Sequence, residues 1–216
     1  MRIRRKPEAI QILQEHPLVY QDSDPLQGEW HSIFDNNHPK YVELGTGKGQ
    51  FLAKASELHP KINWIGVEKI QEPLLHAVRK GEATNNPNLR YLWMDIEKLS
   101  EVFAKQEVDR FYLHFSDPWP KARHAKRRLT NRRFLNVYKH LLSPAGDLIL
   151  KTDSLSLFEF SLEEFQETGW SVIEISRDLH HSSYHELNIT TEYEEKFASQ
   201  GMPIYYVKVK PINTPI

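Results

Sequence analysis

The chain has 216 residues, of which 39% are hydrophobic and 26% are charged, and its 28 lysines and arginines nearly balance its 29 aspartates and glutamates. These values are typical of one ordinary globular domain with a sizeable core. No stretch approaches the ~18 consecutive apolar residues of a membrane span, and the start lacks the apolar centre of a secretory signal. The absence of cysteine excludes disulfides, thiolate metal ligands and thiol nucleophiles. We therefore expect a cytoplasmic protein.

The first 39 residues are polar and show no regular pattern. Turn residues are frequent from Asp22 to Gly28, and the start carries a small basic cluster made of Arg2, Arg4, Arg5 and Lys6. Such a terminus either contacts phosphates or stays disordered. We predict an N-terminal basic arm over residues 1–39 and a folded domain over residues 40–216.

From residue 40 onward, short β-rich runs alternate with helical segments. Alternation of this kind implies right-handed crossovers and a parallel sheet that is covered on both faces, which is a doubly wound α/β domain. We expect strands at 41–44, 62–67, 89–94, 110–115 and 147–152, with helices to about 58 and 84, a short one after 94, and others at 132–142 and 155–167.

The C-terminal part departs from the alternation. Residues 171–177 and 205–210 both have the pattern of strands, and a helical signal lies between them at 192–199. An antiparallel strand at one edge of a mostly parallel sheet accommodates this order. Residues 179–191 show the least regular pattern of the domain.

The turn after the first expected strand is rich in glycine. It reads ELGTGKGQF over residues 43–51, and Gly45, Gly47 and Gly49 are three of only nine glycines in the chain. Glycine permits positive φ and lets the backbone approach a ligand closely. In doubly wound sheets this turn touches a ligand that binds beyond the carboxyl ends of the strands. We favour ligand binding over the alternative, a tight turn with no ligand.

An acidic residue stands at the end of each of the first three expected strands. The glycine spacing differs from the G-x-G-x-x-G dinucleotide fingerprint, and Glu43 before the first glycine would repel a pyrophosphate but favour an amino group or a sulfonium. Glu68 is placed to bind the hydroxyls of a ribose. Asp95 can accept from a purine amine, or it can cap the helix that follows. Together the three acids fit a nucleoside without phosphate, S-adenosylmethionine.

Residues 116–133, SDPWPKARHAKRRLTNRR, set an acidic turn directly against a basic run. Two prolines stiffen the turn, so Asp117 and Trp119 project from a loop at a strand end. Segregated basic charge in a near-neutral chain favours a polyanion partner; the alternative is the solvated face of a helix capped near Thr130. The candidate phosphate-contacting residues are Lys121, Arg123, His124, Lys126, Arg127, Arg128, Arg132 and Arg133.

These motifs give the chain a resemblance to the bacterial tRNA (guanine-N7)-methyltransferase family over residues 40–210. DPWPKARHAKRRL at 117–129 is the most discriminating motif, and ELGTGKGQF, KTD at 151–153 and TEYEEKFASQG at 191–201 add to it. The resemblance implies a Rossmann-like class I methyltransferase fold, S-adenosylmethionine as methyl donor and tRNA as partner. It implies donor contacts by Glu43, Glu68, Asp95 and Asp117, and a target nucleoside at Lys121, Asp153, Thr191, Glu192, Tyr193 and Glu194.

The acceptor atom decides which chemistry the side chains must supply. Guanine N7 has an in-plane lone pair and no proton, so methyl transfer to it needs no general base, and alignment and charge placement dominate. Positive charge leaves sulfur and appears on the purine, where carboxylates stabilise it. We expect Asp117 to be the acid nearest the transfer, with Asp153 and Glu194 orienting the base.

Three alternatives remain open on the residues alone. The DPWP turn is similar to the D-P-P-Y/W turn of exocyclic-amine methyltransferases, although here the second proline follows the aromatic residue. A nicotinamide-dependent reductase is disfavoured by Glu43 and by the glycine spacing. A non-catalytic RNA-binding protein of the same fold is disfavoured by the intact acids.

The chain has 11 histidines, which raises the question of a metal site. His180, His181 and His185 lie close in sequence, but their spacing falls in a serine-rich stretch and matches no metal-binding motif on a helix. We predict no metal, and either a monomer or a homodimer.

Overall fold

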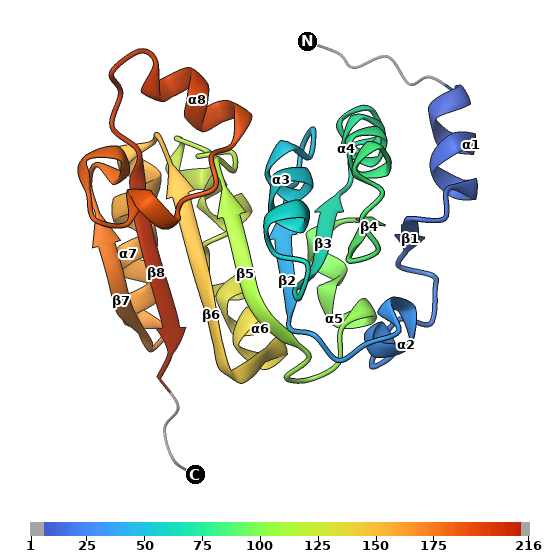
Figure 1. Cartoon of the computed structure of the whole chain (residues 1–216). Helices are drawn as coiled ribbons and strands as arrows, with labels where there is room; N and C mark the ends of the chain where they lie inside the picture. Colours follow the sequence, from blue (N-terminus) through green and yellow to red (C-terminus); the bar gives the residue numbers. More distant parts are fainter. Residues whose placement is uncertain (1–6, 213–216) are drawn as a thin grey trace.

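The computed structural model describes residues 7–212, which form an eight-stranded sheet in the order β1-β4-β3-β2-β5-β6-β8-β7, between two layers of helices (Figure 1). The predicted basic cluster at residues 2–6 lies outside the described residues. The strands are β1 (Val19–Gln21), β2 (Lys40–Leu44), β3 (Asn63–Glu68), β4 (Leu89–Trp93), β5 (Val108–His114), β6 (Leu142–Thr152), β7 (Trp170–Ser176) and β8 (Tyr205–Pro211).

The helices follow the expected alternation from residue 40 onward. Helix α3 covers the sheet after β2, α4 after β3, α6 after β5 and α7 after β6, which confirms the doubly wound α/β prediction. The helices are α1 (Pro7–Glu15), α2 (Trp30–Phe34), α3 (Gln50–Leu58), α4 (Gln71–Thr84), α5 (Leu99–Val102), α6 (Arg132–Leu141), α7 (Leu155–Glu167) and α8 (Glu192–Ala198), with short 3-10 turns at Ile96–Lys98, Ala122–Arg127, Leu179–His181 and His185–Leu187.

The sheet is parallel from β1 to β6 and changes direction at one edge. Strand β8 runs antiparallel to both β6 and β7 and is inserted between them, so β7 forms the edge itself. The expected antiparallel departure at this edge is confirmed. Strand order reverses between β2 and β5, and in open α/β sheets ligands bind beyond the carboxyl ends of the strands at such a point.

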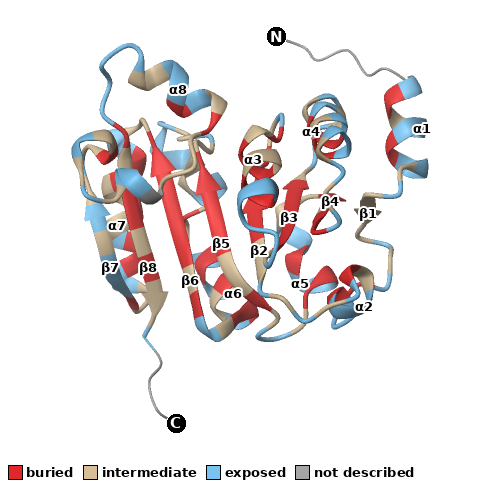
Figure 2. Cartoon of the chain, viewed as in Figure 1, coloured by how far each residue is buried: buried red, intermediate tan, exposed pale blue. Residues whose placement is uncertain are grey.

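Two hydrophobic cores lie on opposite faces of the sheet (Figure 2). Alternate strand residues face opposite sides. In β5, Phe111 and Leu113 join the core under α2, α5, α6 and α7, whereas Tyr112 joins the core under α1, α3 and α4. The same period directs Glu43 of β2, His114 of β5 and Lys151 of β6 toward the α3 side.

Residues 7–39 fold onto the domain, so the expectation of an irregular segment was wrong for this stretch. Strand β1 pairs in parallel with β4, Leu13 of α1 is fully buried against the α3–α4 side, and Trp30 of α2 donates from Nε1 to the Val102 carbonyl at 2.9 Å. A three-residue strand and short helices give little periodicity in sequence, and their stability comes from tertiary contacts. The division at residue 39 stays a prediction.

The helix expected at 132–142 is confirmed as α6, Arg132–Leu141. Asn131 is the N-cap of α6 and accepts from the Arg133 backbone N–H at 3.3 Å, so the expectation of a cap near Thr130 was off by one residue. Thr130 is buried, and its hydroxyl accepts from Ser161 of α7 at 2.7 Å.

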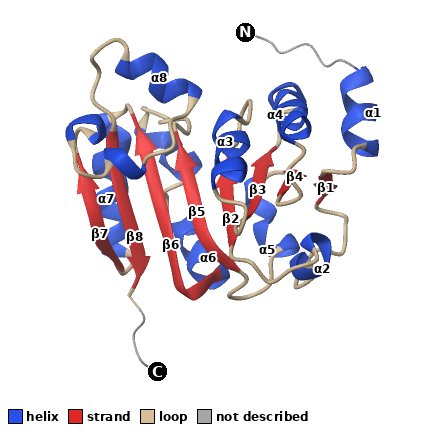
Figure 3. Cartoon of the chain, viewed as in Figure 1, coloured by secondary structure: helices blue, strands red, loops and turns tan. Residues whose placement is uncertain are grey.

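Helix α8 stands apart from the two layers. Figure 3 shows it on the long excursion between β7 and β8, beyond the carboxyl ends of the parallel strands. This segment and the β2–α3 turn therefore meet at the same end of the sheet.

Candidate functional site

The glycine turn between β2 and α3 has the backbone that only glycine adopts easily. Gly45, Gly47 and Gly49 all have positive φ, at 82°, 54° and 74°. A Cβ on Gly45 or Gly47 would meet no atom within 4 Å, so this part of the turn presents bare backbone to open space. A Cβ on Gly49 would lie 2.6 Å from the Cβ of Ala77 in α4, so Gly49 also serves the packing of α3 on α4.

A cavity of about 660 Å³ opens beside this turn, within the size range of small-molecule sites. Its wall includes acids from four strand ends, the glycine turn and part of α8, so the structure brings together residues that are up to 150 positions apart in sequence. The predicted site residues that line it are Glu43, Gly45, Gly47, Gly49, Glu68, Asp95, Asp117, Arg127, Arg133, Thr191, Glu192 and Tyr193.

Glu43 is the most deeply buried acid of the cavity, at 3% exposure. Its carboxyl accepts from the Thr46 hydroxyl at 2.6 Å and contacts His114 Nδ1 at 2.9 Å. Burial raises the pKa of Glu43 to about 8, although Thr46 and the nearby Lys151 act to lower it. Burial also holds the pKa of His114 well below its usual value, with the charge of Lys151 acting the same way. Burial thus favours the protonated form of Glu43 until a cation approaches it.

Glu68 and Asp95 bind the backbone around them. The Glu68 carboxylate accepts from the backbone N–H of Gly47 at 3.2 Å and of Ile70 at 2.8 Å, and burial raises its pKa despite these bonds. Asp95 accepts from the Glu97 N–H at 3.1 Å, which confirms its capping role, and it also lines the cavity. Burial acts to raise the pKa of Asp95, but the bonds from Glu97 and Lys69 lower it overall.

The loop after β5 has an unusual backbone at both ends. Phe115 and Trp119 have positive φ, at 49° and 42°, which is uncommon for residues other than glycine and is associated with functional loops. Asp117 is exposed between them at the cavity wall. The guanidinium of Arg127 lies 4.8 Å from the centre of the Trp119 ring, so both side chains stand at the mouth of the cavity.

The predicted basic run divides into two groups. Arg128 is buried beneath the loop, Arg132 pairs with Glu164 and Glu167, and Arg133 pairs with Glu97. These three residues are engaged with the protein itself. The other members, Lys121, Arg123, His124, Lys126 and Arg127, are exposed or half-exposed and lie on or beside the 3-10 turn at Ala122–Arg127.

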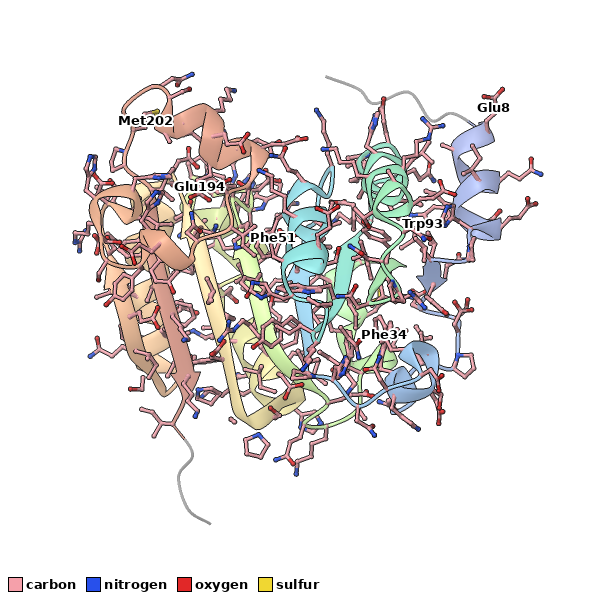
Figure 4. All side chains as sticks on the ribbon, in the orientation of Figure 1. Glu8, Phe34, Phe51, Trp93, Glu194 and Met202 are labelled. Atoms are coloured by element: carbon pink, nitrogen blue, oxygen red, sulfur yellow. The ribbon has the colours of Figure 1, made fainter. Side chains whose placement is uncertain are left out.

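The residues of the TEYE motif point in different directions. Thr191 caps α8 by accepting from the Glu194 N–H at 3.0 Å, and Glu192 and Tyr193 line the cavity. Glu194 is fully buried on the side of α8 that faces the sheet, outside the cavity wall (Figure 4). Asp153 is half-buried and does not line the cavity either.

Several residues of the site were not predicted. His114 and Thr46 give it buried polar groups, Lys151 is buried near Glu43 without lining the cavity, and Ile70, Ile96, Leu129 and Phe134 give it an apolar wall. The period-2 pattern of β5 and β6 contained a signal for two of them, because His114 and Lys151 occupy inward-facing positions among apolar neighbours.

Two further observations bear on the class of protein. Within residues 7–212, no group of three histidines, aspartates or glutamates is arranged to hold a metal ion. None of the helices in the same range has the length and apolar character needed to cross a membrane.

Comparison with known proteins agrees with this geometry. A family model described as "putative methyltransferase" matches residues 37–207. The tRNA (guanine-N(7)-)-methyltransferase of Listeria monocytogenes is 47% identical over 97% of this chain and 98% of its own length. The protein of the same name from Lachnoclostridium phytofermentans is 46% identical over 95% and 96%, respectively. The chain belongs to the tRNA (guanine-N7)-methyltransferase family.

Solved structures agree with the fold. The 16S rRNA methyltransferase KamB superposes with a TM-score of 0.62 at 12% identity, covering 84% of this chain and 91% of that one. The 16S rRNA (adenine(1408)-N(1))-methyltransferase of Catenulisporales acidiphilia gives 0.59 at 16%, covering 89% and 95%. At these identities the likeness concerns the fold alone, which is the Rossmann-like fold of class I methyltransferases.

Proposed function

We propose that this protein methylates N7 of guanine in the variable loop of tRNA, with S-adenosylmethionine as the donor. The observation that carries the proposal is the convergence of the bare glycine turn and four acids, Glu43, Glu68, Asp95 and Asp117, on one cavity that Thr191, Glu192 and Tyr193 also line. The identity to curated enzymes of that name over nearly the whole chain supports it.

The cavity suits a cationic nucleoside. Gly45 and Gly47 leave room for a ligand against their backbone, and the acids of the wall favour a cation over a pyrophosphate. Glu68 has carboxylate lone pairs left for ribose hydroxyls, and Asp95 lies next to the apolar Ile96 where a purine ring would rest. Glu43 would face the positive end of the donor. The donor, when bound, supplies an electrophilic methyl group.

The protein's own residues orient the acceptor and balance charge. Because N7 carries no proton, no side chain has to remove one, and Asp117 is proposed as the acid that stabilises positive charge as it moves from sulfur to the purine. Glu192 and Tyr193 face the same cavity and are the residues of the TEYE segment best placed to meet the base. Trp119 is available for stacking at the cavity mouth.

The exposed basic turn is proposed to hold the RNA backbone. Lys121, Arg123, Lys126 and Arg127 stand beside the cavity with no acidic partner among the ion pairs of the described chain. Phosphate contacts of this kind position a nucleic acid without reading its sequence. The proposal includes cytoplasmic location and action as a monomer or homodimer.

The first experiment is methylation of unmodified tRNA with labelled S-adenosylmethionine, followed by nucleoside analysis and by aniline cleavage after reduction. We expect N7-methylguanosine in the variable loop, and loss of that product with Asp117→Ala while tRNA still binds. Label on an exocyclic amine would keep the fold and the donor but reassign the target. Tight donor binding without any label would favour a non-catalytic RNA-binding protein.

A further inference from the structure

A buried lysine of β6 connects the sheet to α8. Lys151 is 2% exposed, and its ammonium donates to Glu194 Oε2 at 2.8 Å, Asn188 Oδ1 at 2.7 Å and the Ile189 carbonyl at 2.9 Å. These three hydrogen bonds use all three N–H groups of the ammonium. All three acceptors belong to one stretch, residues 188–194, which leads into the first turn of α8.

Glu194 is held from several sides at once. It is fully buried, its second oxygen accepts from the Asn188 amide, and His180 Nε2 lies 3.3 Å from the same oxygen. While it holds these contacts, the carboxylate is fully buried and lies outside the cavity wall. Glu194 therefore meets a base only if the Lys151 contact breaks.

The neighbouring residues of α8 face the cavity because Glu194 faces away from it. Glu192 and Tyr193 line the wall, and the Tyr193 ring stacks on Phe115 with centroids 6.1 Å apart and an angle of 20°. Phe115 belongs to the strand end that leads to Asp117. The rotation of the first turn of α8 thus decides which residues the target would meet.

We propose that Lys151 is a positioning residue, which fixes the first turn of α8 through Glu194 so that Glu192 and Tyr193 stand opposite the donor turn. The register supports this placement, because Lys151 lies opposite His114 in β5, and His114 contacts Glu43. One face of three neighbouring strands thus carries Glu43, His114 and Lys151 side by side, and α8 contacts the ammonium group of Lys151. The proposal rests on the proposed function for its substrate, but the anchoring of α8 is measurable without it.

The chain offers a matched pair of variants. Glu194→Gln keeps the size of the side chain and removes the charge that Lys151 holds, whereas Glu195→Gln makes the same change one residue later at an exposed position. Glu195 is bound by Lys54 at 2.9 Å and Gln50 at 3.1 Å, so it also anchors α8, but from the surface. Exposed ion pairs contribute little, so we expect Glu195→Gln to alter each readout by less than about twofold.

The test combines hydrogen exchange of the α8 amides, affinity for S-adenosylhomocysteine, and kcat/KM for tRNA. For Glu194→Gln we expect α8 to exchange about tenfold faster and kcat/KM to fall about tenfold, as the loss of one charged hydrogen bond implies, with the affinity for S-adenosylhomocysteine unchanged. For Lys151→Met only the hydrogen exchange of the α8 amides is compared, because this change also removes a positive charge near Glu43 and could alter donor binding. It should reproduce the faster exchange, and the double variant should add little to it.

The outcomes separate the possible roles of Glu194. Unchanged α8 exchange in folded Glu194→Gln overturns the proposal. If kcat/KM falls while exchange stays unchanged, Glu194 contacts the base directly and positions nothing. If the wild-type protein binds S-adenosylhomocysteine but methylates no tRNA, the proposed function fails, and the exchange comparison still decides whether Lys151 anchors α8.

Discussion

Arg128 holds the loop that carries Trp119. Its Nε donates to the Pro118 carbonyl at 3.0 Å, its Nη2 donates to the Trp119 carbonyl at 3.1 Å, and its guanidinium lies 4.3 Å from the centre of the Phe160 ring. A basic residue inside a basic run thus serves the protein's own backbone. The loop it braces contains Asp117 and has positive φ at Trp119, a conformation that needs support from its surroundings.

Arg128→Ala is expected to lower the free energy of unfolding by about 2 kcal/mol, because two carbonyl groups lose their donor. Methyl transfer should fall with it at every salt concentration. Arg128→Lys is the matched control, since a lysine keeps the charge but cannot bridge two carbonyls with one planar group. Urea unfolding and initial methylation rates measure both. Recovery of activity by Arg128→Lys would show that charge, and hence phosphate contact, is what Arg128 supplies.

The exposed part of the basic run should behave differently. Arg123→Ala with Lys126→Ala is expected to weaken tRNA binding while leaving stability unchanged, because both side chains are exposed. The slope of log affinity against log salt should shrink by about 1.4 to 1.8, the range for two lost phosphate contacts. Lys61→Ala with Lys105→Ala removes two exposed lysines at the opposite end of the strands and should leave the slope unchanged. Equal effects of the two double variants would contradict a localised RNA surface.

The division of the basic run shows what sequence reasoning reaches. The motif at residues 116–133 predicted a stiff acidic loop beside basic charge. The strand ends at Glu43, Glu68 and Asp95 were predicted as well, because strand and glycine signals are local. The sequence did not show that Arg128 and Arg127 have different roles. Adjacent arginines have the same chemistry, and only the fold decides that one faces two backbone carbonyls while the other reaches the cavity mouth.

Contacts between residues that are far apart in the sequence could not be predicted either. The contacts of Glu43 with His114 and of Lys151 with Glu194 join residues 71 and 43 positions apart, so no local pattern pairs them. The β1–β4 pairing is similar, since three residues give almost no periodic signal and their partner strand lies far along the chain. Burial of polar groups at inward-facing strand positions was readable, but the identity of their partners was not.

Donor binding should depend on pH through Glu43. Its pKa is raised by burial from 4.5 to about 8, so the folded protein keeps a proton that the unfolded chain loses. This group therefore lowers folding stability as pH rises from about 4.5 to about 8. A cationic donor favours the ionised carboxylate, so affinity for S-adenosylmethionine should rise with pH up to about 8.

Calorimetric titration between pH 6.5 and 9 measures this effect, with S-adenosylhomocysteine as the uncharged-sulfur control. We expect the affinity for S-adenosylmethionine to rise more steeply with pH than that for S-adenosylhomocysteine. Glu43→Gln should flatten the difference. The pKa of His114 is too low for this residue to titrate in that range. Identical pH profiles for the two ligands in the wild-type protein would place the sulfonium away from Glu43.

The glycines of the β2–α3 turn should separate packing from binding. In Gly49→Ala the new Cβ meets Ala77 Cβ at 2.6 Å and Ala77 Cα at 2.7 Å, and the residue also has a φ of 74°. Overpacking and left-handed strain together are expected to lower the free energy of unfolding by about 2 to 5 kcal/mol.

Gly47→Ala meets no atom within 4 Å, so left-handed strain of about 1 to 2 kcal/mol is its expected stability cost. Its methyl group would instead stand where a ligand approaches the turn, and S-adenosylhomocysteine should bind at least about tenfold more weakly. If the turn has these two functions, urea unfolding should show the larger stability loss for Gly49→Ala. Calorimetry should show the larger loss of ligand affinity for Gly47→Ala. A larger stability loss for Gly47→Ala than for Gly49→Ala would contradict this. It would mean that the packing of α3 on α4 does not require glycine at position 49, and that the backbone strain is greater at position 47.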